Sequence, residues 1–289
     1  MKWFGTPARV FFPIAVSLAT AVCVPAAGLG DQGRDQGRPV QTSFAALCPE
    51  ARVMPSPVLS PSLKHYIESD VKSVCEYLAR VGVKPDPRPI EISFNPRLID
   101  TAYYAGTGHR IVVATSLAVD IEVILRQYVH VALHSAVSDE ARSVYVSLFP
   151  SIHSGLVNYF LASFHGYPVS RGIACKNTLD VAFIRRLDND LAYEQLPYRV
   201  VWPEKRDILA QVWGGLFWDI RKALGQEKAD KMLLAALRSL RASDFRADSA
   251  GRYPKRLLDA ARLVDGGRHV AAIEKIMQRR NIQASGPDE

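Results

Sequence analysis

The sequence predicts an α+β protein in which a small mixed lobe of helix and strand precedes a mainly helical lobe. Two segments favour strands. Residues 90–94 alternate between apolar and polar side chains, and residues 101–115 are typical of a hairpin that turns at residues 106–108. After residue 120, apolar side chains recur with helical spacing almost to the end of the chain. We therefore expect one small sheet and a larger helical part.

The N-terminal segment is typical of a secretory signal peptide over residues 1–27. Lys2 and Arg9 supply its positive end, and residues 10–24 form an almost unbroken apolar run. Residues 28–42 are rich in Gly, Gln and balanced charge, which predicts a disordered linker. The sequence thus predicts an exported protein, periplasmic or secreted, with no transmembrane segment in the mature chain.

Export makes disulfide bonds possible, and three cysteines follow the predicted signal: Cys48, Cys75 and Cys175. Cys48 and Cys75 share the N-terminal segment, so we expect them to pair and Cys175 to remain a free thiol. Closing a loop of that size would stabilise the fold by about 3–4 kcal/mol. The absence of a Cys-x-x-Cys motif gives no support to a redox or zinc-ribbon role.

The elements follow in order along the mature chain. A helix is predicted from Ser60 to Val81, because Ser60-Pro61 is a start signal and prolines follow its end. After the two strand candidates, further helices are expected near residues 120–137, 139–149, 152–165, 205–224, 227–241, 254–264 and 269–280. These elements divide into an N-terminal α+β lobe (43–138), a helical C-terminal lobe (139–282) and a disordered tail (283–289).

The formal net charge of +7 is concentrated in one region. Residues 221–280 carry 15 basic and 7 acidic side chains. Such an excess attracts anionic partners such as lipid headgroups or envelope material, and it is equally typical of a solvated helical surface. Basic and aromatic residues do not interleave there, so we expect no nucleic-acid partner.

The segment RQYVHVALHSA combines a buried helix with a line of polar side chains. Apolar residues cover most of the circumference of the helix predicted from residue 121 to 137, which indicates burial. Glu122, Arg126, His130 and His134 nevertheless recur every four residues and so form one line along the helix. Either this line faces a cleft, or Glu122 pairs with Arg126 and the histidines bond to neighbouring backbone.

Several stretches resemble the gluzincin-type zinc metallopeptidases, the thermolysin and fungalysin group. DTAYYAGTGHRIVV (100–113) resembles the sheet edge before their active-site helix, and HSGLVNYFLASFHGYP (153–168) resembles their second active-site helix. IRRLDN (184–189) is similar to a loop after that helix, and VWGGLFWDIRKALGQEKADKMLLAALRSL (212–240) is similar to their C-terminal helices. The likeness covers roughly residues 95–280 and implies a zincin-like fold.

The resemblance implies a zinc site, but most of its residues are replaced in this chain. In the family, two histidines and a glutamate from the next helix hold zinc, and another glutamate acts as the general base. His130 matches the second histidine, whereas Arg126 stands in the place of the first and Gln127 in that of the base. Ser154 occupies the position of the glutamate ligand. Asp207 falls near a histidine that steadies the transition state in some members.

These replacements remove the chemistry of the family. The guanidinium of Arg126 stays protonated, which puts a fixed positive charge where the metal would sit. Gln127 accepts no proton at neutral pH, and Ser154 cannot replace a carboxylate ligand. We therefore expect no catalytic residue, no metal and no cofactor at these positions. The alternative is a rebuilt zinc site with ligands drawn from Glu122, His130, His134 and His153.

The sequence leads to the hypothesis of an exported, non-catalytic pseudopeptidase that binds a peptide or protein in a relic cleft. An extended peptide would add to an edge strand of the sheet, and Arg126 would anchor a carboxylate. The residues assigned to this cleft are Ile111, Val112, Val113, Arg126, His130 and His134. Two alternatives remain open. One is an active zinc metallohydrolase with the rebuilt site, and the other is an envelope-associated structural or interaction protein with a basic C-terminal surface.

Overall fold

The computed structural model describes residues 48–99, 101–148, 150–171, 184–193, 203–245 and 252–284. They belong to one compact unit, residues 42–289. The predicted signal peptide, the predicted linker, Cys175 and most of the predicted tail lie outside the described residues. In the described part of the chain, no helix combines the length and the apolar character needed to cross a membrane.

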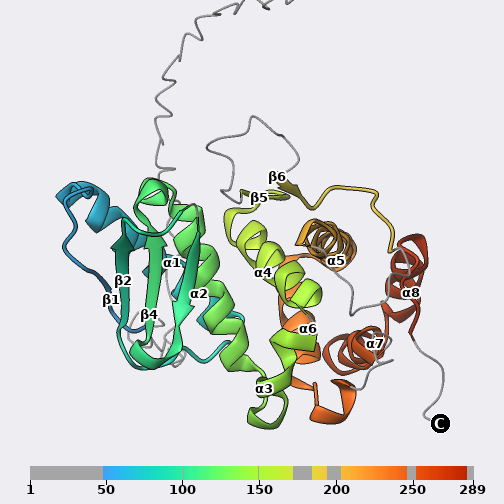
Figure 1. Cartoon of the computed structure of the whole chain (residues 1–289). Coiled ribbons are helices and arrows are strands. Elements are labelled where there is room, and N and C mark those ends of the chain that lie inside the picture. The colour runs from blue at the N-terminus through green and yellow to red at the C-terminus, as the bar shows by residue number, and fades with distance from the viewer. Residues whose placement is uncertain are drawn as a thin grey trace, which may run out of the picture. The chain divides into compact units, whose positions relative to one another are not determined.

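The described chain is a mixed α+β protein with one small sheet and many helices, as predicted (Figure 1). The strands of this sheet are β1 (Ala51–Val53), β2 (Ile90–Asn95), β3 (Ala102–Ala105) and β4 (Arg110–Ala114), and a separate ribbon consists of β5 (Val169–Arg171) and β6 (Ile184–Arg186). The helices are α1 (Pro61–Arg80), α2 (Ile121–Ala136), α3 (Asp139–Leu148), α4 (Pro150–His165), α5 (Pro203–Leu224), α6 (Gln226–Arg238), α7 (Arg252–Asp265) and α8 (Val270–Arg279). Figure 1 shows α2 between the sheet and α4, and α4 next to α5.

The four-stranded sheet has the strand order β1-β2-β4-β3. Strands β1, β2 and β4 are parallel, whereas β3 is antiparallel to β4 and forms the predicted hairpin with its turn at residues 106–108. The assignment of Ile111, Val112 and Val113 to a strand edge is wrong. These residues belong to β4, which is paired on both sides, and their side chains are at most 9% exposed. Among the described strands, the edge on this side of the sheet is β3.

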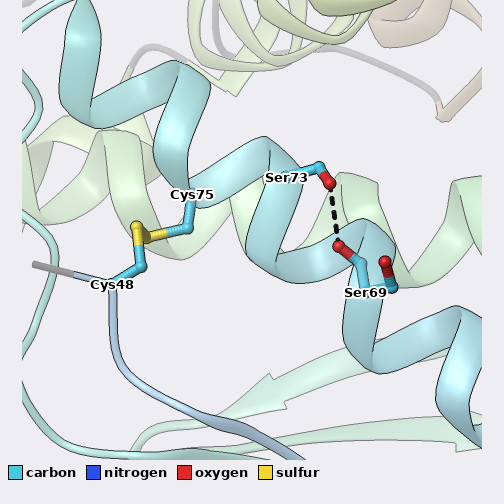
Figure 2. Close-up of a disulfide and its surroundings, with 4 residues drawn as sticks. All are labelled: Cys48, Ser69, Ser73 and Cys75. Atoms are coloured by element: carbon cyan, nitrogen blue, oxygen red, sulfur yellow. Dashed lines mark hydrogen bonds between the residues drawn. A yellow bond between two sulfur atoms is a disulfide. The ribbon is translucent and has the colours of Figure 1, made fainter. Parts of the chain in front are cut away.

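Helix α1 begins as predicted and carries the predicted disulfide. The Ser60 side chain accepts a hydrogen bond from the backbone N–H of Leu63 at 3.1 Å, which caps the first turn. Cys48 is bonded to Cys75 in the middle of α1, with 5.9 Å between their Cα atoms (Figure 2). The prediction of this pair is confirmed, and the bond fastens the segment before β1 to the helix.

Helices α4 and α5 pack closely because glycines line their contact. A Cβ atom on Gly155 of α4 would lie 2.6 Å from the Cβ of Trp213, and one on Gly214 of α5 would lie 2.7 Å from a methyl group of Leu187. Such distances are too short for carbon atoms in van der Waals contact. Gly155 is therefore required where α4 packs against α5, whereas the close contact of Gly214 is with the end of a flexible side chain.

A buried carboxylate connects α1, α4 and α6. Asp230 of α6 is 1% exposed and accepts hydrogen bonds from the hydroxyls of Tyr77 at 2.9 Å, Tyr159 at 2.6 Å and Ser163 at 3.0 Å. Arg221 of α5 donates to the oxygen of Ser163 at 2.6 Å. Both carboxylate oxygens thus have partners, and we call these five residues the Asp230 cluster.

Candidate functional site

The polar line on α2 lies against α4. Glu122 contacts His165, Arg126 contacts Asn158, and the ring of His130 contacts that of His153. Residue numbers rise along α2 while those of the partners fall along α4, so the two helices are antiparallel. We call these three pairs the α2–α4 row. Its members come from two segments that the sequence identified separately.

Arg126 reaches the middle of α4. Its Nη1 donates a hydrogen bond to the side-chain oxygen of Asn158, which is fully buried. Ser154 is half-buried one turn before Asn158 on the same helix. Arg126 and the helix that bears Ser154 therefore meet at one interface, where the direct contact of Arg126 is with Asn158. The side-chain nitrogen of Asn158 is buried and has no hydrogen-bond partner in the described part of the chain.

His130 and His153 pack against each other with 4.7 Å between their ring centroids. His153 is 2% exposed, and its Nδ1 lies 3.2 Å from the hydroxyl of Tyr145 on α3. Burial lowers the pKa of His153 to about 3, and the neighbouring His134 and Arg126 act in the same direction. His153 is therefore a neutral imidazole at any ordinary pH.

The remaining members of the polar line have partners at opposite ends of α2. The Nε2 atom of His134 lies 3.3 Å from the backbone oxygen of Arg142, and burial lowers the pKa of His134. An Oε atom of Glu122 lies 3.1 Å from Nε2 of His165 in the last turn of α4. The bonding of His134 to nearby backbone agrees with one of the two interpretations drawn from the sequence.

The four residues of the alternative zinc site do not gather around one point. Glu122 is paired at one end of α2, and His134 is bonded near the other end. Over the described ranges, no three His, Cys, Asp or Glu side chains are grouped so that they could hold a metal ion. The geometry therefore gives the rebuilt site no support.

Gln127 connects α2 to the edge strand. Its side-chain nitrogen donates a hydrogen bond of 3.0 Å to the backbone oxygen of Ala102 in β3. Arg126 and Gln127 thus both act as hydrogen-bond donors, whereas a zinc ligand or a general base must offer a lone pair. The residues at these positions do not fit a zinc ion.

The other predicted positions contribute less to this site. Asp207 lies in α5, but its side chain is outside the described part.

Within residues 221–280, several basic side chains have internal partners. Arg280 is 4% exposed and pairs with Asp219 at 2.7 Å, and Arg256 pairs with Asp244 at 3.0 Å. Part of the regional positive charge is thus used within the fold.

Asn158, Tyr145 and His165 of the site were not singled out from the sequence. Asn158 follows Ser154 by one turn and lies within the mainly apolar stretch 155–162 of α4, where an amide is a usable signal. Tyr145 gave no signal, because its contact with His153 depends on how α3 packs against α4.

Comparison with models of known protein families and with curated proteins gives no match. The described side chains of the α2–α4 row offer a carboxylate, a guanidinium, an amide and three imidazoles, and burial keeps the imidazole of His153 neutral. In the described residues no three of the possible ligands are grouped around one point, and the guanidinium in the middle of the row would repel a dication.

Proposed function

We propose that this chain is an exported, non-catalytic protein with a zincin-like fold, which binds an extended peptide beside its sheet. The contact between Arg126 and Asn158 is the observation that carries the proposal. It sets a permanently charged guanidinium between the two helices whose motifs resemble those that hold zinc in the gluzincins. A metal ion at that point would be repelled, and the peptidase chemistry would be lost with it.

The role of Gln127 agrees with the loss of catalysis. In an active peptidase the side chain at this position takes a proton from water, which requires a carboxylate. The amide of Gln127 donates to the backbone of Ala102. Its hydrogen-bonding role is thus opposite to that of a base.

The outer edge of β3, which no other described strand pairs with, supports a peptide as the ligand. An edge strand presents backbone N–H and C=O groups that pair with an added strand. Apolar side chains are exposed beside this edge: Tyr103 is 45% exposed, and Ile99, three residues before β3, is 85% exposed. An extended peptide would satisfy the backbone groups and cover these side chains.

Zinc analysis of the purified protein, together with a peptide library, tests the absence of catalysis. We expect far less than one equivalent of zinc and no cleavage of a mixed peptide library. One equivalent of zinc with cleavage that a chelator stops would overturn the proposal.

Restoring the family's residues tests the relation to zincins. The triple variant Arg126→His, Gln127→Glu and Ser154→Glu removes the cation and supplies an imidazole and two carboxylates. We expect it to bind about one equivalent of zinc, and we expect His130→Ala in the same background to abolish that binding. A triple variant with native circular dichroism and no zinc would contradict the zincin relation.

A further inference from the structure

The backbone pairing of β3 determines which of its groups face outward. Ala102 lies opposite Val113 and Tyr104 opposite Ile111, and the backbone N–H of Ala114 donates to the oxygen of Thr101 at 2.8 Å. In an antiparallel pair, residues alternate between those that bond to the partner strand and those that do not. Thr101 bonds to β4, so Ala102 and Tyr104 direct their backbone groups to the outer edge.

Gln127 is hydrogen-bonded to one of these outward groups. The oxygen of Ala102 accepts the side-chain hydrogen bond from Gln127 at 3.0 Å, so an added strand must compete with Gln127 for it. The outward backbone groups of Tyr104 take part in none of the hydrogen bonds described for the chain. An antiparallel strand therefore forms its complete pair of hydrogen bonds opposite Tyr104 and only an incomplete pair opposite Ala102.

We infer that Gln127 competes with an extended peptide for the carbonyl of Ala102, so that the peptide pairs fully with β3 only opposite Tyr104. This inference rests on the proposed function and gives Gln127 a positioning role within it. The peptide residue opposite Tyr104 exchanges two hydrogen bonds with it. The residue two positions later in the peptide lies opposite Ala102, whose carbonyl already accepts from Gln127, so the peptide gains less from its hydrogen bond there.

The hydrogen bond to Ala102 depends on the amide of Gln127, because an amide combines the required length with an N–H donor. Methionine at residue 127 has a similar length and no donor. Glutamate has the same shape but donates only when it is protonated. The variants Gln127→Met and Gln127→Glu therefore remove the hydrogen bond with little change in volume.

The test uses a blocked hexapeptide, selected for binding to the wild-type protein from a random library of blocked hexapeptides. Its N-methyl derivative at the residue opposite Ala102 lacks the donor for that carbonyl. We expect wild-type protein to bind both peptides equally. Gln127→Met should bind the unmethylated peptide about three- to tenfold more tightly than the methylated one, which is the range of one net hydrogen bond.

Peptide affinity measured against pH separates a specific effect of the Gln127 hydrogen bond from a general disturbance of the structure. Gln127→Glu should behave like Gln127→Met when its carboxyl is ionised, and like wild type at acidic pH, where the protonated carboxyl donates to Ala102. Gln278→Glu makes the same change at an exposed site on α8 and should leave peptide binding unchanged at every pH.

The outcomes distinguish the two proposals. If no hexapeptide of the library binds wild-type protein at the β3 edge, the proposed function fails and the inference about Gln127 fails with it. If a hexapeptide binds there, but N-methylation has the same effect on wild type and on Gln127→Met, only the inference about Gln127 is overturned.

Discussion

Helix α4 bears two buried polar groupings that differ in how fully they are hydrogen-bonded. In the Asp230 cluster, three hydroxyls donate to the two oxygens of one carboxylate. In the α2–α4 row, the side-chain nitrogen of Asn158 and one carboxylate oxygen of Glu122 are buried without a hydrogen-bond partner in the described chain. Both groupings lie on the same helix, so differences in helix stability do not explain the contrast.

The contrast distinguishes buried polar residues that stabilise the fold from buried polar residues that are candidates for a function. A buried polar group without a partner costs about 1–3 kcal/mol, and most such groups in proteins are paired. The Asp230 cluster meets that rule and is explained by the joining of α1, α4 and α6. The α2–α4 row breaks the rule at two atoms. Arg142, Trp213 and Tyr253 break it at one atom each elsewhere in the described chain, so the row is a candidate site because its two atoms lie between the helices that bear the zincin-like motifs.

Removal of the carboxylate at the centre of the Asp230 cluster should have the largest effect. Asp230→Ala leaves three buried hydroxyls without their acceptor, and we expect the free energy of unfolding to fall by about 3–5 kcal/mol. Urea denaturation measures this change. The control is Asp259→Ala, whose ion pair with Arg262 is exposed and should contribute less than about 1 kcal/mol. Equal losses in the two variants would show that the Asp230 cluster is not a structural centre.

Acid should weaken the α2–α4 row through His153. Burial lowers the folded-state pKa of His153 to about 3, below the value near 6.5 of an unfolded chain. The unfolded state therefore takes up this proton first, and stability that is complete above pH 6.5 is lost as the pH falls toward 3. Between pH 6.5 and 5 we expect a loss of about 2 kcal/mol from this group.

Non-titrating variants isolate that contribution. His153→Gln keeps an acceptor for the hydroxyl of Tyr145 and should reduce the slope of stability against pH over this range. His65→Gln, at an exposed position of α1, is the matched control and should leave the slope as in wild type. If both variants keep the wild-type slope, His153 is not held neutral by burial in the row.

Local signals in the sequence were sufficient for much of the fold. The helix expected at residues 120–137 is observed as Ile121–Ala136, and the cap at Ser60 and the hairpin turn at residues 106–108 are confirmed. These features depend on side-chain periodicity and on turn or capping residues close in sequence. Strands β1, β5 and β6 were not predicted, because three residues are too few to show alternation.

Features that depend on distant contacts could not be predicted in the same way. The order of strands is not encoded in any one segment, and the edge was therefore assigned to Ile111–Val113 and not to β3. The polar line on α2 was identified, and His153 was named as a possible ligand, but the partners Asn158 and His165 were not predicted. Asn158 is 32 residues from Arg126 in sequence, and His165 is 43 residues from Glu122. Such pairs depend on how whole helices pack.

The smallest expected effect concerns the amide of Asn158, and it tests the contrast between the two groupings directly. Asn158→Asp replaces a buried unpaired donor with a carboxylate that accepts from Arg126, and we expect the free energy of unfolding to rise by about 1 kcal/mol. Asn189→Asp is the matched control. The side-chain nitrogen of Asn189 donates to the backbone oxygens of Arg186 at 2.5 Å and Gln211 at 3.2 Å, so the same change should cost about 1–3 kcal/mol.

The sign of the Asn158→Asp effect decides how the row is interpreted. A stabilised variant means that the wild-type amide is unsatisfied, as expected if the row is adapted to something other than folding. A loss as large as that of Asn189→Asp means that the amide of Asn158 has a partner in solution, such as a bound water. The row would then be as fully hydrogen-bonded as the Asp230 cluster, and the α2–α4 interface would lose its claim to be the functional part of α4.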